Sequence, residues 1–389
     1  MPKRKPRWRK ETLARASEGS HSDTSSRTAQ LVAQLCEIGP DVPEIARRLG
    51  QYKESVRYRY KTKIVDKGLV VQAAVDHERL GLRRVMAVID FAKEYSPYAE
   101  TILTAMSELC YVVSFEQLFP SGAYNVAASV PSEFVDDYAR LIEHLSKKGL
   151  FSSSGVHVFD WFRNLPMQAK FYDFDTGRWD FDWSSPKEPE FGLASYTPSS
   201  KTRFDHTDLL LLKELYVEAD RPLVDIAKKI DVSYKKLAWH FTNHVLSRGL
   251  IKGYTVRWPG TRFDQRADKA HQRRHRYFWI DILVKDMNET ERMNVMAKIG
   301  RLPFLWAEAV GKSFFAQLAL PVDFLTESLQ YIEGALSEVK ERADLWLPDQ
   351  THALAFTIGY RLYDEKLGQW TFDAPSIEAR FDQLVMKIK

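Results

Sequence analysis

The spacing of apolar residues changes along the first half of the chain, and each spacing predicts a different kind of element. Apolar positions three and four residues apart predict helices over 27–38, 42–49 and 53–66. The apolar run "LVVQAAV" after Gly68 predicts a short strand. Three short helices followed by a strand are typical of a winged helix-turn-helix.

A second module follows, with the order strand, helix, strand, strand, helix, strand. This order is typical of a four-stranded antiparallel sheet backed by two helices, the ferredoxin-like arrangement. The predicted elements cover residues 84–91, 96–110, 111–118, 123–130, 132–149 and 155–162.

The two modules occur twice along the chain, in the same order. "EIARRLGQYKESVRYRYKTKIVDKGLV" (44–70) aligns without a gap on "DIAKKIDVSYKKLAWHFTNHVLSRGLI" (225–251), and "YDFDTGRWDFD" (172–182) recurs as "YDEKLGQWTFD" (363–373). We therefore predict an α+β fold. It is a tandem duplication of a winged helix-turn-helix followed by a ferredoxin-like βαββαβ domain, with each unit closed by a C-terminal β-hairpin.

Composition shifts place the boundaries between these segments. The predicted domains are a basic tail (1–26), a first winged helix-turn-helix (27–78), a first ferredoxin-like domain with its hairpin (79–183), a linker (184–204), a second winged helix-turn-helix (205–258), a basic insert (259–275), a second ferredoxin-like domain with its hairpin (276–375) and a C-terminal helix or tail (376–389).

The turn between the second and third helices carries the most specific part of the motif. Ala46 is small enough for a helix crossing, and Gly50 suits a turn with positive φ. The second unit keeps Ala227 and places Asp231 at the turn, and Asp tolerates the left-handed region better than most residues. A three-helix module for protein contacts is the alternative interpretation.

The third helix of such a motif enters the major groove of DNA, so its polar residues are the predicted DNA contacts. These are Lys53, Arg57, Arg59, Lys61 and Lys63 in the first unit, and Tyr234, Lys235, Lys236, His240, Asn243, His244 and Arg248 in the second.

Charge is segregated although the net charge is only +4. The tail contains Lys3, Arg4 and Lys5, and the insert contains Arg273 and Arg274, which we predict to contact phosphates. The two cysteines, Cys36 and Cys110, favour a reducing compartment, and no apolar run is long enough to cross a bilayer.

At this point the chain resembles the Lrp/AsnC (feast/famine) family of transcriptional regulators, most specifically through "IARRLG" and "KGLV". The resemblance implies a covalently fused dimer that binds double-stranded DNA, without a cofactor or a membrane, in the cytoplasm and associated with the nucleoid. It also implies homo-oligomerisation through the ferredoxin-like domains. It further implies an amino-acid or other small-molecule effector near the turn formed by Gly122, Tyr124 and Asn125.

The alternative within the same architecture is an enzyme. The fused two-unit form also resembles siroheme decarboxylases, through "AYNVAAS" and the histidines of "HQRRHR", His271 and His275. The chain contains no Gly-x-Ser-x-Gly, Walker, His-Glu-x-x-His or Cys-x-x-Cys motif. The main prediction is therefore a DNA-binding regulator that is not an enzyme.

"YDFDTGRWDFD" begins like a calcium loop, but its repeat decides against a metal site. Asp175 is matched by Lys366, whereas the turn glycine, Gly177, is matched by Gly368. No glutamate stands at the twelfth position that a calcium loop requires. Alternating aromatic residues after a turn glycine predict a structural β-hairpin, and no metal site is predicted.

Overall fold

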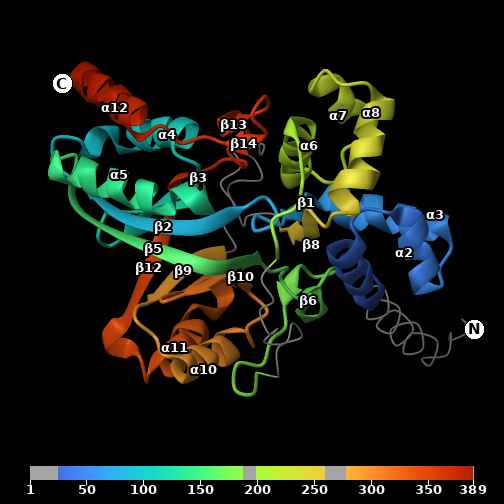
Figure 1. The fold of residues 1–389 in the computed structure, drawn as a ribbon. Helices are drawn as coiled ribbons and strands as arrows, with labels where there is room; N and C mark the ends of the chain where they lie inside the picture. Colours follow the sequence, from blue (N-terminus) through green and yellow to red (C-terminus); the bar gives the residue numbers. More distant parts are fainter. Residues whose placement is uncertain (1–24, 187–198, 259–276, 389) are drawn as a thin grey trace, which may run out of the picture.

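The computed structural model describes residues 25–186, 199–258 and 277–388. Within these ranges the chain is a mixed α+β protein. Figure 1 shows the two helix-turn-helix units on one side of the molecule and a large sheet with its covering helices on the other. The predicted basic insert, most of the basic tail and much of the linker lie outside the described residues.

The first unit begins with a helix over residues 25–38. Its further elements are α2 (Val42–Leu49), α3 (Lys53–Arg59), the wider turn η1 (Tyr60–Ile64), β1 (Val70–Val75), β2 (Leu82–Phe91), α4 (Ala99–Leu109), β3 (Val112–Phe119), β4 (Tyr124–Pro131), α5 (Val135–Lys147), β5 (Phe151–Asn164), β6 (Tyr172–Asp173) and β7 (Arg178–Trp179).

The second unit repeats this order, and a final helix follows it. Its elements are α6 (His206–Val217), α7 (Leu223–Lys229), α8 (Tyr234–His240), η6 (Phe241–Leu246), β8 (Ile251–Arg257), β9 (Tyr277–Val284), α10 (Glu289–Ile299), β10 (Leu305–Gly311), β11 (Phe314–Pro321), α11 (Leu325–Leu336), β12 (Ala343–Ala355), β13 (Tyr363–Asp364), β14 (Gln369–Trp370) and α12 (Ala374–Ile388).

The turn residues of the two helix-turn-helix units adopt the predicted conformation. Gly50 ends α2 with φ 61°, and Asp231 follows α7 with φ 54°. Ala46 and Ala227 are buried where the helices cross. Both units therefore contain the turn that the sequence pattern predicts, although only one of them has glycine there.

Among the described residues, the eight strands of the two βαββαβ modules form one closed barrel. Within each unit the neighbour order is β3-β4-β2-β5 or β10-β11-β9-β12. The two four-stranded sheets join at both edges, because β5 pairs with β10 and β12 pairs with β3. The prediction of two separate ferredoxin-like sandwiches is corrected in this respect. Closure satisfies the backbone groups that an open sheet edge would leave unpaired.

Helices cover the outside of this barrel, and side chains fill its inside. Figure 1 shows α4 and α5 over the half built by the first unit, and α10 and α11 over the half built by the second. An apolar group inside the barrel is formed by Met86, Phe159, Leu283, Ala309 and Phe315. A polar group, described below, occupies another part of the interior.

The predicted wings are not separate hairpins. β1 of the first unit pairs with β8 of the second in an antiparallel two-stranded ribbon, with Val70 opposite Arg257. Each unit contributes one strand, so neither forms a wing of its own. This pairing is a second place where the duplicated units complete one another.

The C-terminal hairpins also cross between units. The β6–β7 hairpin packs on the second unit, where Trp179 donates a hydrogen bond from Nε1 to the Tyr277 hydroxyl at 2.8 Å. The β13–β14 hairpin packs on the first unit, where Trp370 donates from Nε1 to the Leu80 carbonyl at 2.8 Å. The prediction of aromatic hairpins is confirmed, but each hairpin contacts the other unit rather than the preceding strands alone.

Trp370 is fully buried, and its loss is expected to weaken the contact between units. Trp370→Phe leaves the buried Leu80 carbonyl without this donor, which should lower the free energy of unfolding by about 1–3 kcal/mol. Trp179→Phe is the matched control, because Trp179 is only half-buried and its partner is a hydroxyl that can rotate. Denaturant unfolding of the full chain measures both. Equal losses in the two variants would contradict the expectation.

None of the helices in the described ranges is both long and apolar enough to span a lipid bilayer.

Candidate functional site

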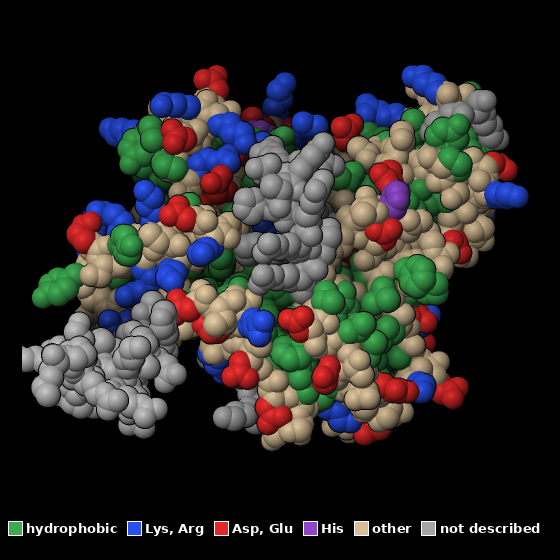
Figure 2. Space-filling model, turned by 180° about the vertical axis from the view of Figure 1, so that it is seen from behind, with side chains coloured by type: hydrophobic (Ala, Val, Ile, Leu, Met, Phe, Trp, Pro, Cys, Tyr) green, Lys and Arg blue, Asp and Glu red, His purple; other side chains and the backbone are tan. Residues whose placement is uncertain are grey.

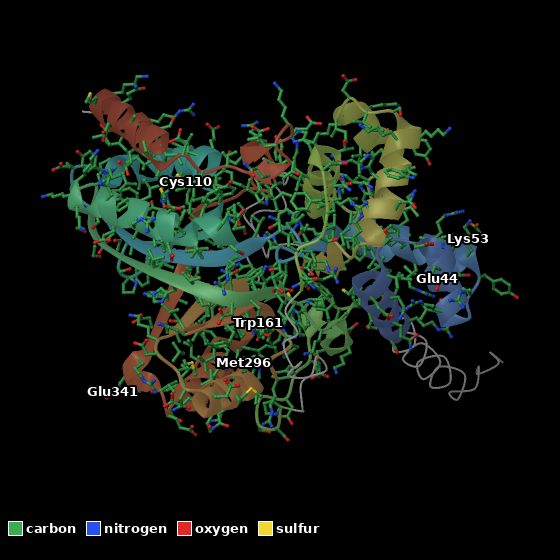
Figure 3. The ribbon with its side chains drawn as sticks, viewed as in Figure 1. Glu44, Lys53, Cys110, Trp161, Met296 and Glu341 are labelled. Carbon is green, nitrogen blue, oxygen red and sulfur yellow. The ribbon has the colours of Figure 1, made fainter. Side chains whose placement is uncertain are left out.

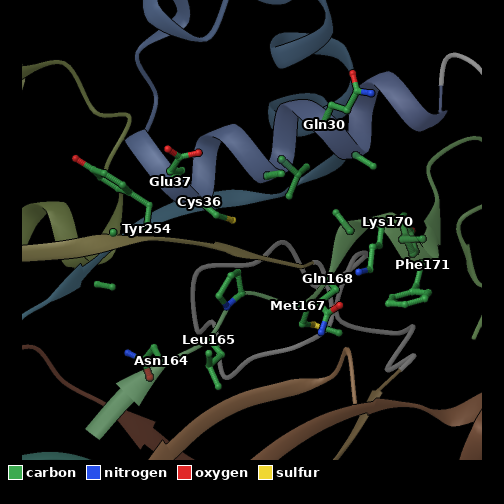
Figure 4. Close-up of a pocket in the computed structure, with 18 of the residues that line it drawn as sticks. Gln30, Cys36, Glu37, Asn164, Leu165, Met167, Gln168, Lys170, Phe171 and Tyr254 are labelled. Carbon is green, nitrogen blue, oxygen red and sulfur yellow. The ribbon is translucent and has the colours of Figure 1, made fainter. Parts of the chain in front are cut away.

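A cavity of about 1360 Å³ lies between the first helix, the β1–β8 ribbon and the segment that follows β5. Figure 4 shows Gln30 and Cys36 on the helix, across the cavity from Met167 and Gln168 on the segment. Sequence reasoning missed this cavity, because its walls come from three elements that are distant in the chain.

The walls of the cavity are partly apolar and carry three cationic side chains. Arg163, Lys170 and Lys252 line it, and Figure 4 shows the Lys170 side chain reaching into it. The Arg163 guanidinium donates to the buried Glu308 carboxylate, and Lys252 Nζ lies 3.4 Å from Glu78. The residues described as lining the cavity include no histidine. Four carboxylates line the cavity as well: Glu37, Asp173, Asp175 and Asp180. The site can therefore hold a large, partly apolar molecule with charged groups at its edge.

A second, small pocket of about 120 Å³ adjoins the cavity. Phe162 and Asn164, near the end of β5, line both. The small pocket extends between the β1–β8 ribbon and the inside of the barrel, and polar side chains of several strands face it. The two spaces therefore share two residues of their walls.

Arg84 on β2 lines the small pocket. Its guanidinium carbon lies 4.0 Å from the centre of the Phe162 ring. Its Nε is buried and has no hydrogen-bond partner, and no carboxylate among the described residues pairs with it. Burial lowers the pKa of Arg84 to about 10, so the side chain remains a cation at neutral pH. The side chain as a whole is half-buried, so its charge is only partly removed from water.

Two carboxyl groups meet inside the barrel beside this pocket. Asn125 Nδ2 donates to Glu116 at 3.0 Å and to Asp281 at 2.8 Å. Gln317 Nε2 donates to the same two carboxyl groups at 3.0 and 2.9 Å. The four side chains come from β3, β4, β9 and β11, so both units contribute. We name Glu116 and Asp281 the acid pair.

The acid pair keeps a proton more readily than exposed carboxyl groups do. Burial raises the pKa of Glu116 well above its usual value, and the neighbouring Asp281 raises it further. Burial also raises the pKa of Asp281, although the bonds from Glu116, Gln317 and Asn125 lower it in part. Two adjacent buried carboxyl groups cannot both ionise easily. The pair can therefore serve as a proton donor at neutral pH.

The predicted effector residues are not grouped around an open turn. Gly122 is in the turn between β3 and β4 with φ 77°. Tyr124 is buried and packs edge-on against Phe91. Asn125 is buried inside the barrel, where it bridges the acid pair. The expectation of an effector site at the turn is corrected, because the side chains of Tyr124 and Asn125 are buried and only Gly122 lies in the turn.

The predicted DNA-contacting residues of the first unit differ in exposure. Arg59 donates to Gln51 at 2.8 Å, and Lys63 forms an ion pair with Asp175 at 2.9 Å. Figure 3 shows Lys53 at the outer edge of the molecule. Three of the five cationic side chains are exposed: Lys53, Arg57 and Lys61.

Two of the predicted DNA contacts in the second unit are wrong. His240 and His244 are only 4% and 8% exposed, because both face the core of their own unit and contact Asp208. Arg248 donates to the Arg203 carbonyl at 2.6 Å. The remaining residues are exposed: Tyr234, Lys235, Lys236 and Asn243.

Charge on the surface is mixed rather than uniformly basic. On the face seen in Figure 2, Lys and Arg side chains gather over the helix-turn-helix side, with acidic side chains between them. The remaining predicted contacts lie outside the described residues, together with His271 and His275: Lys3, Arg4, Lys5, Arg273 and Arg274.

Sequence reasoning missed Arg84 and the acid pair as well. The available signal was a charged residue within an otherwise apolar strand, as in "VVSFEQL" for Glu116 and "WIDILV" for Asp281. Charged residues are almost never fully buried unless they are paired. That signal marks unusual positions, but it does not tell which strands bring them together.

Comparison with known proteins gives no match to a family model and none to a curated protein. Solved structures do match. The siroheme decarboxylase NirDL has a TM-score of 0.53 at 12% identity, over 91% of this chain and 99% of that chain. NirDL in co-complex with an iron-uroporphyrin III analogue has a TM-score of 0.50 at 13% identity, over 95% and 100%. AsnC of E. coli has a TM-score of 0.28 at 16% identity, over 34% and 90%.

These matches overturn two predictions. The helix-turn-helix motifs and the resemblance to the Lrp/AsnC family predicted a DNA-binding regulator, and the lack of catalytic motifs predicted that it is not an enzyme. Both predictions are wrong, because the two-unit architecture in full is found in an enzyme. At 12–13% identity the likeness to the decarboxylase establishes the fold. The chain thus shares its fold, over nearly its whole length, with siroheme decarboxylase.

Proposed function

We propose that the chain is a decarboxylase of a tetrapyrrole that carries several carboxylates, such as siroheme. The observation that carries the proposal is the small pocket, where the half-buried Arg84 guanidinium and Glu116 of the acid pair face the same space beside a large cavity. The full-length likeness to siroheme decarboxylase supports the substrate class.

The large cavity suits the body of such a substrate. Its volume of about 1360 Å³ exceeds the range of roughly 300–1000 Å³ found for most ligand pockets. Apolar side chains such as Leu165 and Met167 can contact the faces of a flat ring system. Lys170 and Lys252 can pair with carboxylates at its rim. The adjoining pocket is large enough for one carboxymethyl side chain.

In this arrangement Arg84 binds and orients the carboxylate that is removed. No carboxylate among the described residues pairs with the guanidinium, so its donors can pair with a bound carboxylate. Binding energy from the rest of the substrate in the large cavity brings the carboxylate into this position. Fixed orientation of the reacting bond is a major source of rate acceleration.

The acid pair supplies the proton that the reaction needs. The bond between the methylene carbon and the carboxyl carbon breaks, carbon dioxide leaves, and the electron pair stays on the methylene carbon. The conjugated ring of the substrate delocalises this electron pair. A proton from the acid pair then moves to the same carbon and converts the carboxymethyl group into a methyl group, and the pair regains a proton from solvent.

Incubation of the purified full chain with siroheme in D₂O tests the proposal. Mass spectrometry should show that the substrate loses carbon dioxide and gains deuterium in the new methyl group. Siroheme that stays intact, whether bound or unbound, would contradict the proposed function.

Filling the large cavity should block substrate binding without disturbing the core. Ala33 lies on the first helix, is exposed and lines the cavity, so Ala33→Trp places an indole inside it. We expect at least a tenfold loss of siroheme affinity, measured by absorbance titration, because a substrate cannot occupy the same volume. Ala379→Trp on the exposed face of α12 is the matched control and should bind as the wild type does. Unchanged affinity in Ala33→Trp would exclude this cavity as the site.

A further inference from the structure

Four side chains that can bind a metal ion converge in the second helix-turn-helix unit. Asp205 precedes α6 and Asp208 lies in its first turn, while His240 ends α8 and His244 lies one turn later in η6. One ligand atom from each lies within 4.8 Å of all the others. The group spans two helices that pack against each other, and it is separate from the proposed substrate site.

The histidines present the same ring nitrogen to the same carboxylates. His240 Nδ1 lies 2.8 Å from Asp208 and 3.7 Å from Asp205. His244 Nδ1 lies 2.9 Å from Asp208 and 4.0 Å from Asp205. Ligands at roughly 2.0–2.1 Å from a tetrahedral zinc ion are about 3.3–3.4 Å apart. The observed separations bracket this value, so small side-chain adjustments suffice.

Burial and access also suit a metal site. Asp208, His240 and His244 are buried, so water competes weakly for their ligand atoms. The Asp205 side chain is 48% exposed, which gives an ion a path from solvent. Asp205 and Asp208 also form the capping box of α6, which fixes the direction of both carboxylates.

The first unit is an internal comparison for these positions. His240 and His244 align on Arg59 and Lys63, neither of which is a metal ligand. Thr28 is the equivalent of Asp208 in the first unit. Each is buried and lies three residues before a buried leucine, Leu31 or Leu211. The first unit therefore folds in the same way without any of the three ligands. The second unit has gained a set of ligands that the fold itself does not require.

The geometry points to a binding site for a divalent transition-metal ion of the zinc class at Asp205, Asp208, His240 and His244. Two imidazole nitrogens and two carboxylates are ligands that zinc accepts in a four-coordinate site. The bound ion ties the third helix of the second unit to α6. This assignment does not depend on the proposed decarboxylation.

Zinc titration of the chelator-treated full chain tests the site by calorimetry, with cobalt absorbance as a second measurement. The wild type should bind one zinc ion at these residues, show the visible bands of four-coordinate cobalt and melt at a higher temperature with zinc. Asp205→Asn should weaken zinc binding at least tenfold while keeping the helix cap, because Asn caps as well as Asp. His244→Gln should abolish the site.

His352→Gln is the matched control, since His352 is exposed, pairs with Glu100 outside this group and should not affect the titration. Zinc held by histidines elsewhere would survive in Asp205→Asn and His244→Gln. Equal zinc affinity in the wild type and Asp205→Asn would overturn the proposal, as would a wild type without cobalt bands. In that case the four side chains form a hydrogen-bonded core group only.

Discussion

Arg84→Met is expected to abolish carbon dioxide release and, at the same time, to make the free protein more stable. The substitution keeps an unbranched apolar side chain in the small pocket and removes the charge. Decarboxylation of siroheme should fall by at least about 100-fold, because the reacting carboxylate loses the group that orients it. The free energy of unfolding should rise by up to about 1 kcal/mol, because the half-buried cation has no carboxylate partner among the described residues.

The opposite signs of these effects make the prediction specific to a binding role. A cation that served only the fold would destabilise the protein when removed. The contact of the guanidinium with the Phe162 ring offsets part of its cost, which is why the expected gain is modest.

The neighbouring arginine is the control for this experiment. Arg83 points to the other face of β2, is half-exposed and pairs with Asp160 at 2.7 Å. Arg83→Met should leave both turnover and stability close to those of the wild type, since exposed ion pairs contribute little. Turnover is followed by mass spectrometry and stability by denaturant unfolding. Loss of stability in Arg84→Met with unchanged turnover would refute the role assigned to Arg84.

Much of the fold could be predicted from the sequence, because its elements are local and repeated. The order of helices and strands depends on apolar spacing. Because the sequence is duplicated, an element predicted in one unit could be compared with the aligned residues of the other. The turn at Asp231 illustrates this, since only its alignment on Gly50 identified it. The strand pairings between units could not be predicted. The strands that pair, β5 with β10 and β1 with β8, are far apart in the sequence, and apolar spacing is a local signal.

The site was harder to predict. One error, the assignment of two histidines to the DNA-binding surface, could have been avoided from the sequence. His240 and His244 were assigned to a DNA-facing surface by the motif, yet His244 lies seven residues after the buried Leu237. Seven residues are close to two helical turns, so the side chains of Leu237 and His244 lie on the same face of the helix, which faces the core. Arg84 and the acid pair could not be assigned to a site at all, since the barrel assembles them from both units.

Glu116→Gln is expected to change how stability depends on pH. The pKa of Glu116 is raised in the folded state, so the folded protein holds a proton that the unfolded chain releases above about pH 4.3. The contribution of Glu116 to the free energy of unfolding is therefore greatest below that pH, and it falls as the pH rises toward the pKa of Glu116 in the folded protein. The expected slope from one extra proton is about −1.4 kcal/mol per pH unit.

Gln can donate a hydrogen bond to Asp281 as the protonated acid does, so the variant should keep the bridged arrangement without this titration. Its stability should vary less with pH and exceed that of the wild type at the alkaline end. Asp281→Asn should have a similar effect, and the double variant should differ little from either, because the pair acts as one proton site. Chemical unfolding at a series of pH values measures all three variants.

The same substitution should slow decarboxylation by roughly 10²- to 10⁴-fold, since an amide cannot donate the proton to carbon. Glu143→Gln on the exposed face of α5 is the control. The hydrogen bond from Lys147 lowers the pKa of Glu143, so this carboxylate is ionised at neutral pH and carries no proton. It should leave both the slope and the turnover unchanged. A flat pH profile in the wild type would show that the acid pair holds no extra proton. Full turnover in Glu116→Gln would show that Glu116 is not the proton donor.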